Sequence, residues 1–300
     1  MEKMKKISVI GAGTMGSGIA HTFAQHGFDV QLIDKQPQAL EKALETIEKN
    51  LQRQLDKGVI EKEKVRETLK NIQPESHLQK GVETADLVVE AVIEDFGTKA
   101  EIFQQLDTFC LKTCILSSNT SSISIGKLAS CTKRPEKVIG MHFMNPVPLM
   151  KLVEVIAGIN TSPETKKTIM TLAESLDKSP VLVQDFPGFI ANRILMPMIN
   201  EAIYSLQEGV AGVKEIDQIM HLGMAHPMGP LELADFIGLD VCLSILKVLQ
   251  EGLGSNKYAP CPLLVKLVNA GYLGKKSGAG FYQYESGAKQ KQVAGYFNHQ

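Results

Sequence analysis

The fold of this chain is decided by one stretch, Lys6-Ile-Ser-Val-Ile-Gly-Ala-Gly-Thr-Met-Gly-Ser-Gly-Ile-Ala20. A short apolar run breaks at Gly11 and gives way to apolar residues at helical spacing, which predicts a strand, a tight turn and a helix. Gly11 allows the turn, Gly13 lets the backbone approach a pyrophosphate, and Gly16 lets the helix pack closely on the strand. The phosphates of a dinucleotide would bind the N–H groups at the positive end of this helix. The alternative is a strand–helix–strand unit without a ligand, because glycines at strand ends are common.

A carboxylate at the end of the second predicted strand narrows the choice of dinucleotide. The apolar run 30–33 ends at Asp34, about 20 residues beyond the glycines, where dinucleotide-binding units place an acidic residue. Asp34 can accept a hydrogen bond from the 2′-hydroxyl of the adenosine ribose and would repel a 2′-phosphate. The sequence therefore predicts NAD rather than NADP as the cofactor.

Composition sets the broad class of the protein. A chain of 300 residues is long enough for about two domains, and no stretch is apolar enough to span a bilayer. Lys+Arg 32 against Asp+Glu 33 leaves the chain near neutral, which argues against broad attraction to nucleic acid or to membranes. The first predicted strand begins almost at once, without room for a signal peptide. The five cysteines lack metal-ligand spacing, so we expect no metal site and reduced thiols in a cytoplasmic protein.

A charged segment, residues 38–72, carries two apolar stripes at helical spacing. It predicts two helices that form a hairpin inserted between strands, with Gly58 ending the first helix and the second running from Glu61 to Ile72. Lys49, Arg53 and Lys57 recur at four-residue steps and share one side of the first helix. This side is either an ordinary solvated charged face or a cationic surface for a phosphate-bearing substrate tail.

Further strands are predicted at residues 86–93, 114–118 and 137–142, with a helix between the first two. Strand–helix–strand order is typical of a doubly wound sheet, which binds ligands at the carboxyl ends of its strands. Glu94, Asn119 and Ser121 follow strand ends and should therefore lie on the same edge as the glycine turn. Another strand at 151–156, a helix at 163–176 and a strand at 180–184 complete this α/β part of the chain.

Beyond about residue 185 the strand signals stop, so we predict two domains, 1–185 and 186–300. The second should be helical at 188–207, 213–222, 231–250 and 262–270, with a polar, loose tail from about Gly287. The segment 231–249 is apolar on more than one side, as at a subunit interface.

The strongest candidate for chemistry is the stretch His142-Phe-Met-Asn-Pro-Val-Pro-Leu-Met-Lys-Leu-Val-Glu154. If its two strands fold back antiparallel about Pro148, His142 and Glu154 face each other. Glu154 also interrupts an apolar strand, and an unpaired buried carboxylate is costly. A histidine held by a carboxylate through one ring nitrogen can use the other as a base. The alternative is that His142 ends a strand while Glu154 meets solvent.

Together with NAD, this pair predicts oxidation of an alcohol. His142 would take the hydroxyl proton while hydride leaves the same carbon. Ser121 and Asn192 could hydrogen-bond the substrate oxygen as it becomes a carbonyl, although Ser and Asn are also common as helix caps.

Motifs spread along the chain resemble those of the short-chain L-3-hydroxyacyl-CoA dehydrogenases, most closely the bacterial 3-hydroxybutyryl-CoA dehydrogenases. They occur in the family's order over about residues 5–284: Gly11-Ala-Gly-Thr-Met-Gly-Ser-Gly18, Asn119-Thr-Ser-Ser122, Gly140-Met-His-Phe-Met-Asn-Pro146, Lys151-Leu-Val-Glu-Val-Ile156, Pro187-Gly-Phe-Ile-Ala-Asn-Arg193, His226-Pro-Met-Gly-Pro230 and Gly274-Lys-Lys-Ser-Gly278. The resemblance implies a Rossmann-type NAD-binding domain with an inserted helical hairpin, followed by an all-α substrate and dimerisation domain. It further implies reversible oxidation of (S)-3-hydroxyacyl-CoA to 3-oxoacyl-CoA, in fatty-acid or butanoate metabolism, by a cytoplasmic homodimer.

The resemblance also assigns residues. It implies His142 as general base oriented by Glu154, with Ser121 and Asn192 near the reacting oxygen. Asn50 and Lys57 match the arm that contacts coenzyme A. The positions expected at the cofactor are Gly11, Gly13, Thr14, Met15, Gly16, Asp34, Glu94, Lys99, Asn119, Ser121, Asn145 and Lys276.

Two other functions stay open at this point. One is a free hydroxy-acid dehydrogenase on a similar scaffold, without coenzyme A. The other is a catalytically idle structural relative, like the lens crystallins that resemble this family, although the intact His142, Glu154, Ser121 and Asn192 argue against it.

Overall fold

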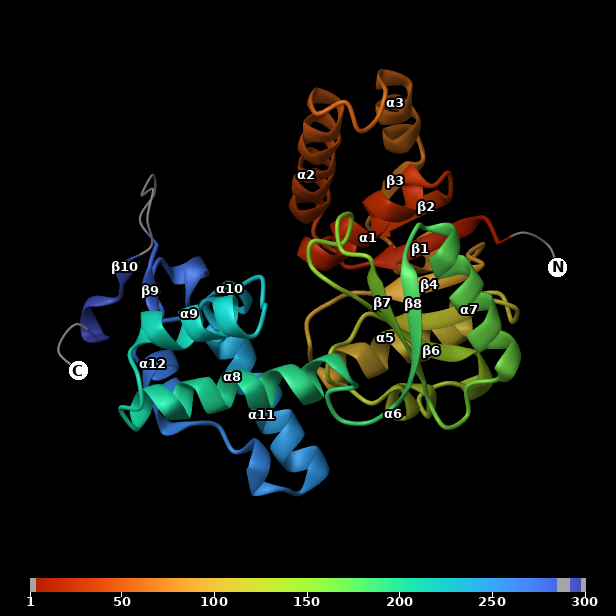
Figure 1. The fold of residues 1–300 in the computed structure, drawn as a ribbon. Coiled ribbons are helices and arrows are strands. Elements are labelled where there is room, and N and C mark those ends of the chain that lie inside the picture. The colour runs from red at the N-terminus through yellow and green to blue at the C-terminus, as the bar shows by residue number, and fades with distance from the viewer. Residues whose placement is uncertain (1–3, 285–291, 298–300) are drawn as a thin grey trace. The chain divides into compact units, whose positions relative to one another are not determined.

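The computed structural model describes residues 4–284 and 292–297. The chain divides into two compact units, residues 1–186 and 187–300. The first contains the large sheet and the second is mainly helical (Figure 1). None of the helices in the described ranges is long and apolar enough to cross a membrane.

The first unit is built on an eight-stranded sheet with strand order β3-β2-β1-β4-β5-β6-β7-β8. The strands from β3 to β6 pair in parallel, β7 runs antiparallel to β6, and β8 is parallel to β7. This order reverses direction between β1 and β4, which is the switch point where doubly wound sheets bind ligands. The predicted α/β class is confirmed. The strands are β1 (Lys6–Ile10), β2 (Asp29–Ile33), β3 (Ile72–Glu75), β4 (Leu87–Glu90), β5 (Ile115–Ser118), β6 (Val138–Phe143), β7 (Leu152–Ala157) and β8 (Ser179–Gln184).

Helices complete the first unit, and its buried core joins side chains of the sheet to those of α1, α2 and α7. Phe23 of α1, Ile47 of α2 and Ile169 of α7 are all buried in this core. The helices are α1 (Thr14–Gln25), α2 (Pro37–Asp56), α3 (Lys62–Lys70), α4 (Leu78–Val82), α5 (Phe96–Phe109), α6 (Ile125–Ala129) and α7 (Pro163–Ser175), with a 3₁₀ turn η1 at Pro135–Lys137.

The glycine turn has the geometry that its sequence predicts. Gly11 has φ +98°, and a Cβ there would press on the carbonyl group of Ala91 in the neighbouring chain segment. A Cβ on Gly16 would collide with the carbonyl oxygen of Gly11. Helix α1 can therefore leave β1 this closely only because both residues lack a side chain.

The predicted hairpin forms, but its second helix is shorter than predicted. Helices α2 and α3 pack together as the hairpin, with Gly58 in the left-handed region between them. Ile72, which the helical spacing had included in the second helix, instead begins β3 and pairs with Val30 of β2. Pairing with the sheet buries Ile72, so tertiary contacts override the local pattern here.

The second unit is a bundle of helices: α8 (Ala191–Gln207), α9 (Val213–Gly223), α10 (Pro230–Ile237), α11 (Leu239–Leu253) and α12 (Pro262–Asn269), with 3₁₀ turns η2 (Asn256–Tyr258), η3 (Lys275–Ser277) and η4 (Gly295–Phe297). The prediction of one helix over 231–250 is wrong. Gly238 has φ +106°, which ends α10 and starts α11 in a new direction.

The tail is more ordered than predicted in its described part. Strand β10 (Gln292–Val293) pairs antiparallel with β9 (Tyr282–Gln283), and Phe297 packs into the helical core. Two apolar residues in a polar tail, Ala294 and Phe297, provide the burial that holds it. The segment 285–291 and the last three residues lie outside the described part, so the prediction of a loose tail is not tested there.

Candidate active site

The turn between β1 and α1 fits the pyrophosphate of a dinucleotide. Helix α1 begins at Thr14 without a side-chain cap and without an acidic residue in its first turn. Its first N–H groups therefore point toward an open helix end, which favours an anion. A Cβ on Gly13 would meet no atom within 4 Å, so the space beside the turn is open. These features are what a bound pyrophosphate requires.

Asp34 follows β2 and is tied to the same turn. Its Oδ2 accepts a hydrogen bond of 2.9 Å from the Ala12 amide, and its Oδ1 accepts one of 2.9 Å from the Gln36 amide. Asp34 therefore both holds the glycine turn and places a carboxylate at the sheet edge. A carboxylate in this position suits the ribose of NAD and opposes a 2′-phosphate.

His142 and Glu154 form the pair that the antiparallel arrangement predicts. They are direct partners in the register of β6 and β7, and His142 Nδ1 lies 2.8 Å from Glu154 Oε2. Both side chains are buried. A buried carboxylate on Nδ1 fixes the orientation of the ring and favours the tautomer in which Nδ1 carries the proton. Nε2 is then the atom suited to accept a proton from a substrate.

Glu94 organises the loop that contains Ser121. Glu94 Oε1 accepts hydrogen bonds from the backbone amides of Ser121 and Ser122, at 2.9 and 3.0 Å, and from the Thr120 hydroxyl at 2.6 Å. Burial acts to raise the pKa of Glu94, but the Lys99 ammonium and these hydrogen bonds outweigh it and lower the pKa. Asn119 Oδ1 accepts from the amide of Phe143, which links this loop to the strand of His142.

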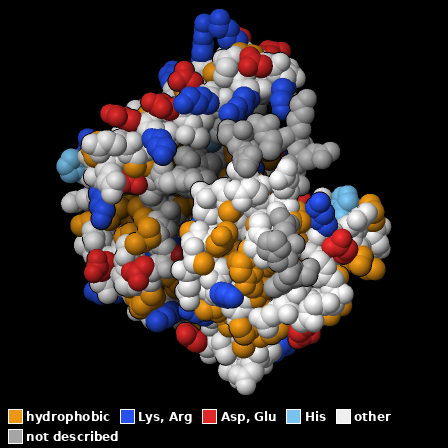
Figure 2. Space-filling model, turned by 90° about the vertical axis from the view of Figure 1, so that its left-hand side faces the viewer, with side chains coloured by type: hydrophobic (Ala, Val, Ile, Leu, Met, Phe, Trp, Pro, Cys, Tyr) orange, Lys and Arg blue, Asp and Glu red, His pale blue; other side chains and the backbone are white. Residues whose placement is uncertain are grey.

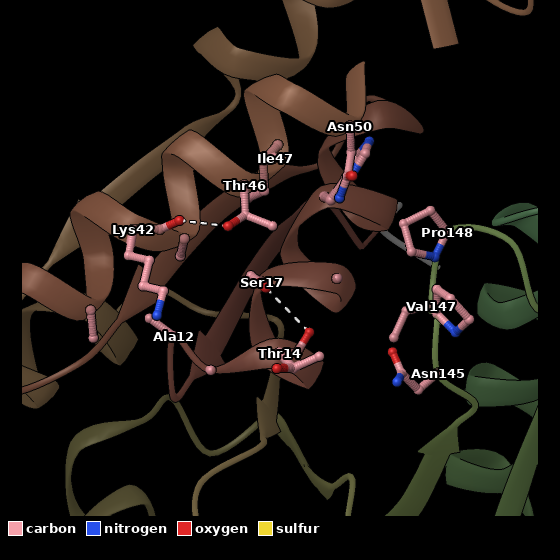
Figure 3. Close-up of a pocket in the computed structure, with 16 residues that line it drawn as sticks. Ala12, Thr14, Ser17, Lys42, Thr46, Ile47, Asn50, Asn145, Val147 and Pro148 are labelled. Atoms are coloured by element: carbon pink, nitrogen blue, oxygen red, sulfur yellow. Dashed lines mark hydrogen bonds between the residues drawn. The ribbon is translucent and has the colours of Figure 1, made fainter. Parts of the chain in front are cut away.

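A cavity of about 410 Å³ opens beside the glycine turn. Figure 3 shows Thr14 and Ser17 of α1 on its floor, Lys42, Thr46 and Asn50 of α2 on one side, and the loop Asn145–Pro148 opposite. This loop connects β6 to β7, so the cavity wall and the His142–Glu154 pair belong to one continuous hairpin. A ligand that fills the cavity would therefore extend from α2 toward the β6–β7 hairpin.

Both units match one protein family. Residues 6–186 match the 3-hydroxyacyl-CoA dehydrogenase NAD binding domain, and residues 188–284 match the 3-hydroxyacyl-CoA dehydrogenase C-terminal domain. The chain belongs to the 3-hydroxyacyl-CoA dehydrogenase family. It is an NAD-dependent oxidoreductase of that family, as the resemblance implies.

Relatives of this chain are similar over almost their full length. The probable 3-hydroxybutyryl-CoA dehydrogenase of Bacillus subtilis is 55% identical, over 94% of this chain and 98% of its own. The mitochondrial hydroxyacyl-coenzyme A dehydrogenase of Homo sapiens is 41% identical, over 94% and 92%. The crystal structure of (S)-3-hydroxybutyryl-CoA dehydrogenase from Ralstonia eutropha matches with a TM-score of 0.91 and 42% identity, over 95% of this chain and all of that one.

The α2–α3 hairpin displays its basic residues to solvent. Lys49, Arg53 and Lys57 are exposed on α2, and Figure 2 shows Lys and Arg side chains gathered over the hairpin at the top of the view. Lys49 lies 3.8 Å from Glu45, an exposed pair of the ordinary helical kind. Asn50 lines the cavity, whereas Lys57 caps the end of α2 beyond it.

Two predicted site residues belong to the second unit. Asn192 lies in the first turn of α8 and is buried. Lys276, in η3, forms an ion pair of 2.6 Å with Asp240 of α11. Met15 and Asn145 belong to the first unit, in α1 and in the cavity wall respectively.

Lys99, a predicted cofactor residue, lies in α5 with its side chain buried. Its ammonium is buried, 2.7 Å from Glu90 Oε1 and 3.4 Å from Glu94 Oε2. Sequence analysis missed Glu90, although its signal was present: like Glu154, Glu90 interrupts an apolar strand. His21, to which the sequence gives little weight as a residue of the first helix, is buried in α1 and lines the cavity.

The described residues contain no group of three or more His, Cys, Asp or Glu side chains that could hold a metal ion. All five cysteines are free thiols, and four of them are buried.

Proposed function

We propose that this protein reversibly oxidises a short-chain (S)-3-hydroxyacyl-CoA, such as 3-hydroxybutyryl-CoA, to the 3-oxoacyl-CoA. The observation that carries the proposal is the buried contact of 2.8 Å between His142 Nδ1 and Glu154 Oε2. It gives the chain an oriented base in the same sheet as a turn fitted to NAD. The names of relatives at 50 to 55% identity support the short acyl chain.

In this proposal His142 takes the proton from the substrate hydroxyl on Nε2. Glu154 keeps the ring in place and stabilises the positive charge that the imidazole then acquires. NAD, when bound, accepts the hydride from the same carbon. Ser121 and Asn192 donate hydrogen bonds to the oxygen as it becomes a carbonyl. In the reverse direction His142 returns the proton to that oxygen.

The glycine turn and Asp34 support the assignment of the cofactor site. Gly11, Gly13 and Gly16 admit the pyrophosphate, which the amides of Thr14 and Met15 would bind, and Asp34 would bind the ribose. We assign Glu94, Lys99, Asn119, Ser121, Asn145 and Lys276 to the cofactor as well, and we assign Asn50 and Lys57 to coenzyme A. The two domains then serve NAD binding (1–185) and substrate binding with dimerisation (186–300).

The test is oxidation of NADH with acetoacetyl-CoA, followed by NADH absorbance. His142→Gln should lower kcat on the order of 10²- to 10⁴-fold while NADH affinity, measured by fluorescence titration, persists. Glu154→Gln should lower kcat less, because the base remains and only its orientation and charge support weaken. If both variants kept the wild-type kcat, another residue would have to be the base.

A comparison of acetoacetyl-CoA with acetoacetate separates an acyl-CoA enzyme from a dehydrogenase of free hydroxy acids. Lys57→Glu should raise KM for acetoacetyl-CoA by repelling its phosphates, and leave KM for NADH unchanged. Lys70→Glu, an exposed charge reversal at the end of α3, is the matched control. Equal effects of the two reversals would contradict the assignment of Lys57.

We further propose a cytoplasmic homodimer that associates through the helical unit. Free thiols fit a reducing compartment. Ile219, Leu222 and Met224, at the end of α9, are large apolar side chains exposed in the single chain. Sedimentation should give the mass of a dimer, and Leu222→Glu should shift it toward the monomer.

A further inference from the structure

The carboxyl ends of β4 and β5 enclose a charged cluster around Glu90, a residue with no role in the proposed mechanism. Glu90 ends β4, Ser118 ends β5, and the two residues are partners in the strand register. Glu90 is 0% exposed and Lys99, from the first turns of α5, is 1% exposed. Both side chains are therefore enclosed by the first unit.

Both oxygens of the Glu90 carboxylate accept hydrogen bonds. Its Oε1 accepts from Lys99 Nζ at 2.7 Å and from the Val92 amide at 2.7 Å, and its Oε2 accepts from the Ser118 hydroxyl at 2.6 Å. Donors on both oxygens fix the carboxylate, and the carboxylate in turn fixes the ammonium of Lys99. A buried pair of this kind needs such a complete set of partners to persist.

Lys99 connects this cluster to the sheet edge. Its Nζ lies 3.4 Å from Oε2 of Glu94, whose other oxygen gathers the Thr120–Ser122 loop. The two oxygens of Glu94 therefore have different partners: one holds the ammonium and the other holds the loop. Glu90, Lys99, Glu94 and the loop of Ser121 form one chain of contacts.

We infer that Glu90 is a positioning residue, which holds Lys99 against Glu94 and thereby sets the place of Ser121. The inference rests on the proposed function, since Ser121 matters only if it meets the substrate. The lowered pKa of Glu94 agrees with it, because the Lys99 ammonium favours the ionised carboxylate.

The experiment is a pair of double-mutant cycles. Glu90→Gln should weaken NADH binding about tenfold, measured by nicotinamide fluorescence, because it releases Lys99 from its fixed position. In a Glu94→Gln background, Glu90→Gln should weaken NADH binding less than about threefold. Lys99 then has no Glu94 charge to hold, so releasing Lys99 changes little. The second cycle measures kcat: Glu90→Gln should lower kcat less in a Ser121→Ala background than in the wild type.

Asp107→Asn is the matched control. Asp107 lies near the other end of α5, the helix that carries Lys99, and the change breaks its ion pair of 2.9 Å with Arg134. Its effects should be equal in the wild-type, Glu94→Gln and Ser121→Ala backgrounds. If Glu90→Gln behaved like this control, with independent effects in both cycles, Glu90 would be a structural residue only and the inference would be overturned.

Two further variants keep the test decisive if Glu90→Gln does not fold. Ser118→Ala removes one donor from Glu90 and should give a smaller effect with the same coupling. The double variant Glu90→Gln with Lys99→Met removes one negative and one positive charge together. Its thermal midpoint should therefore stay closer to that of the wild type than the midpoint of either single variant. The NADH cycle needs no acyl substrate, so it decides the inference even if the wild type fails to reduce acetoacetyl-CoA, a result that would contradict the proposed function instead.

Discussion

Acidification should destabilise the first unit through His21. This histidine is 0% exposed, and its Nδ1 has no hydrogen-bond partner among residues 4–284 and 292–297. Its Nε2 lies 3.5 Å from the side-chain amide of Gln54. Burial is the main cause that lowers the pKa of His21 from 6.5 to about 4, helped by the charges of His26 and Lys178, while Gln25 opposes the shift.

The sign and size of the effect follow from linkage between protonation and folding. Because the folded state has the lower pKa, the unfolded state takes up the proton first as pH falls below 6.5. The corresponding stability is fully present above pH 6.5 and is lost as pH falls through 4. A change from 6.5 to about 4 corresponds to about 3 kcal/mol, of which about 1.4 kcal/mol is lost by pH 5.5.

The perturbation is His21→Gln, which removes the titrating group and keeps a polar side chain beside Gln54. Urea unfolding at pH 7.5, 6.5 and 5.5, read by pulsed hydrogen exchange and mass spectrometry, resolves peptides of the first unit from those of the second. The variant should lose about 1 kcal/mol of the pH dependence of the first unit between pH 7.5 and 5.5. His77→Gln, which removes an exposed histidine from the same unit, is the control and should keep the wild-type dependence. An unchanged pH dependence in His21→Gln would refute the reasoning.

Three further predictions concern the cofactor turn and the second unit. Asp34→Ala should weaken NADH binding about ten- to a hundredfold and reduce the preference for NADH over NADPH, measured by fluorescence titration with each dinucleotide. Unchanged NADH affinity would contradict the ribose contact. Gly13→Ala should keep the thermal midpoint, because its Cβ meets no described protein atom within 4 Å, but should weaken NADH binding. Gly16→Ala should lower the midpoint, because its Cβ collides with the Gly11 carbonyl oxygen. Equal midpoints would be inconsistent with this geometry. Burial is the main cause that raises the pKa of Asp235 from 3.8 to about 6, so the folded state takes up the proton first as pH falls. The free energy of unfolding of the second unit should therefore rise by about 1 kcal/mol from pH 7 to pH 5. Asp235→Asn should abolish this rise in the same exchange experiment.

Some errors at the level of secondary structure have one common cause. Ile72 continues a helical pattern in the sequence, and Leu231 to Gln250 read as one helix, yet pairing with β2 and the positive φ of Gly238 decide otherwise. The polar composition of the tail predicted no structure, while the burial of Phe297 supplies it. Each outcome depends on a neighbour that is distant in the chain or on a backbone angle that periodicity does not encode.

The sequence by itself determined the features that local chemistry dictates. Glycines at Gly11 and Gly16, the carboxylate at Asp34, and the symmetric spacing of His142 and Glu154 about Pro148 each express a steric or electrostatic need that only a few residue types meet. Their pattern was enough to predict the doubly wound sheet, NAD and the buried pair.

Only the tertiary structure decided how the remaining charges are used. Lys99 is buried against Glu90, a carboxylate nine residues earlier in the chain, and no pattern in the sequence pairs the two. Whether a charged side chain meets solvent, a ligand or a partner depends on which strands and helices enclose it. Sequence spacing does not contain that information, because desolvation is a property of the assembled core.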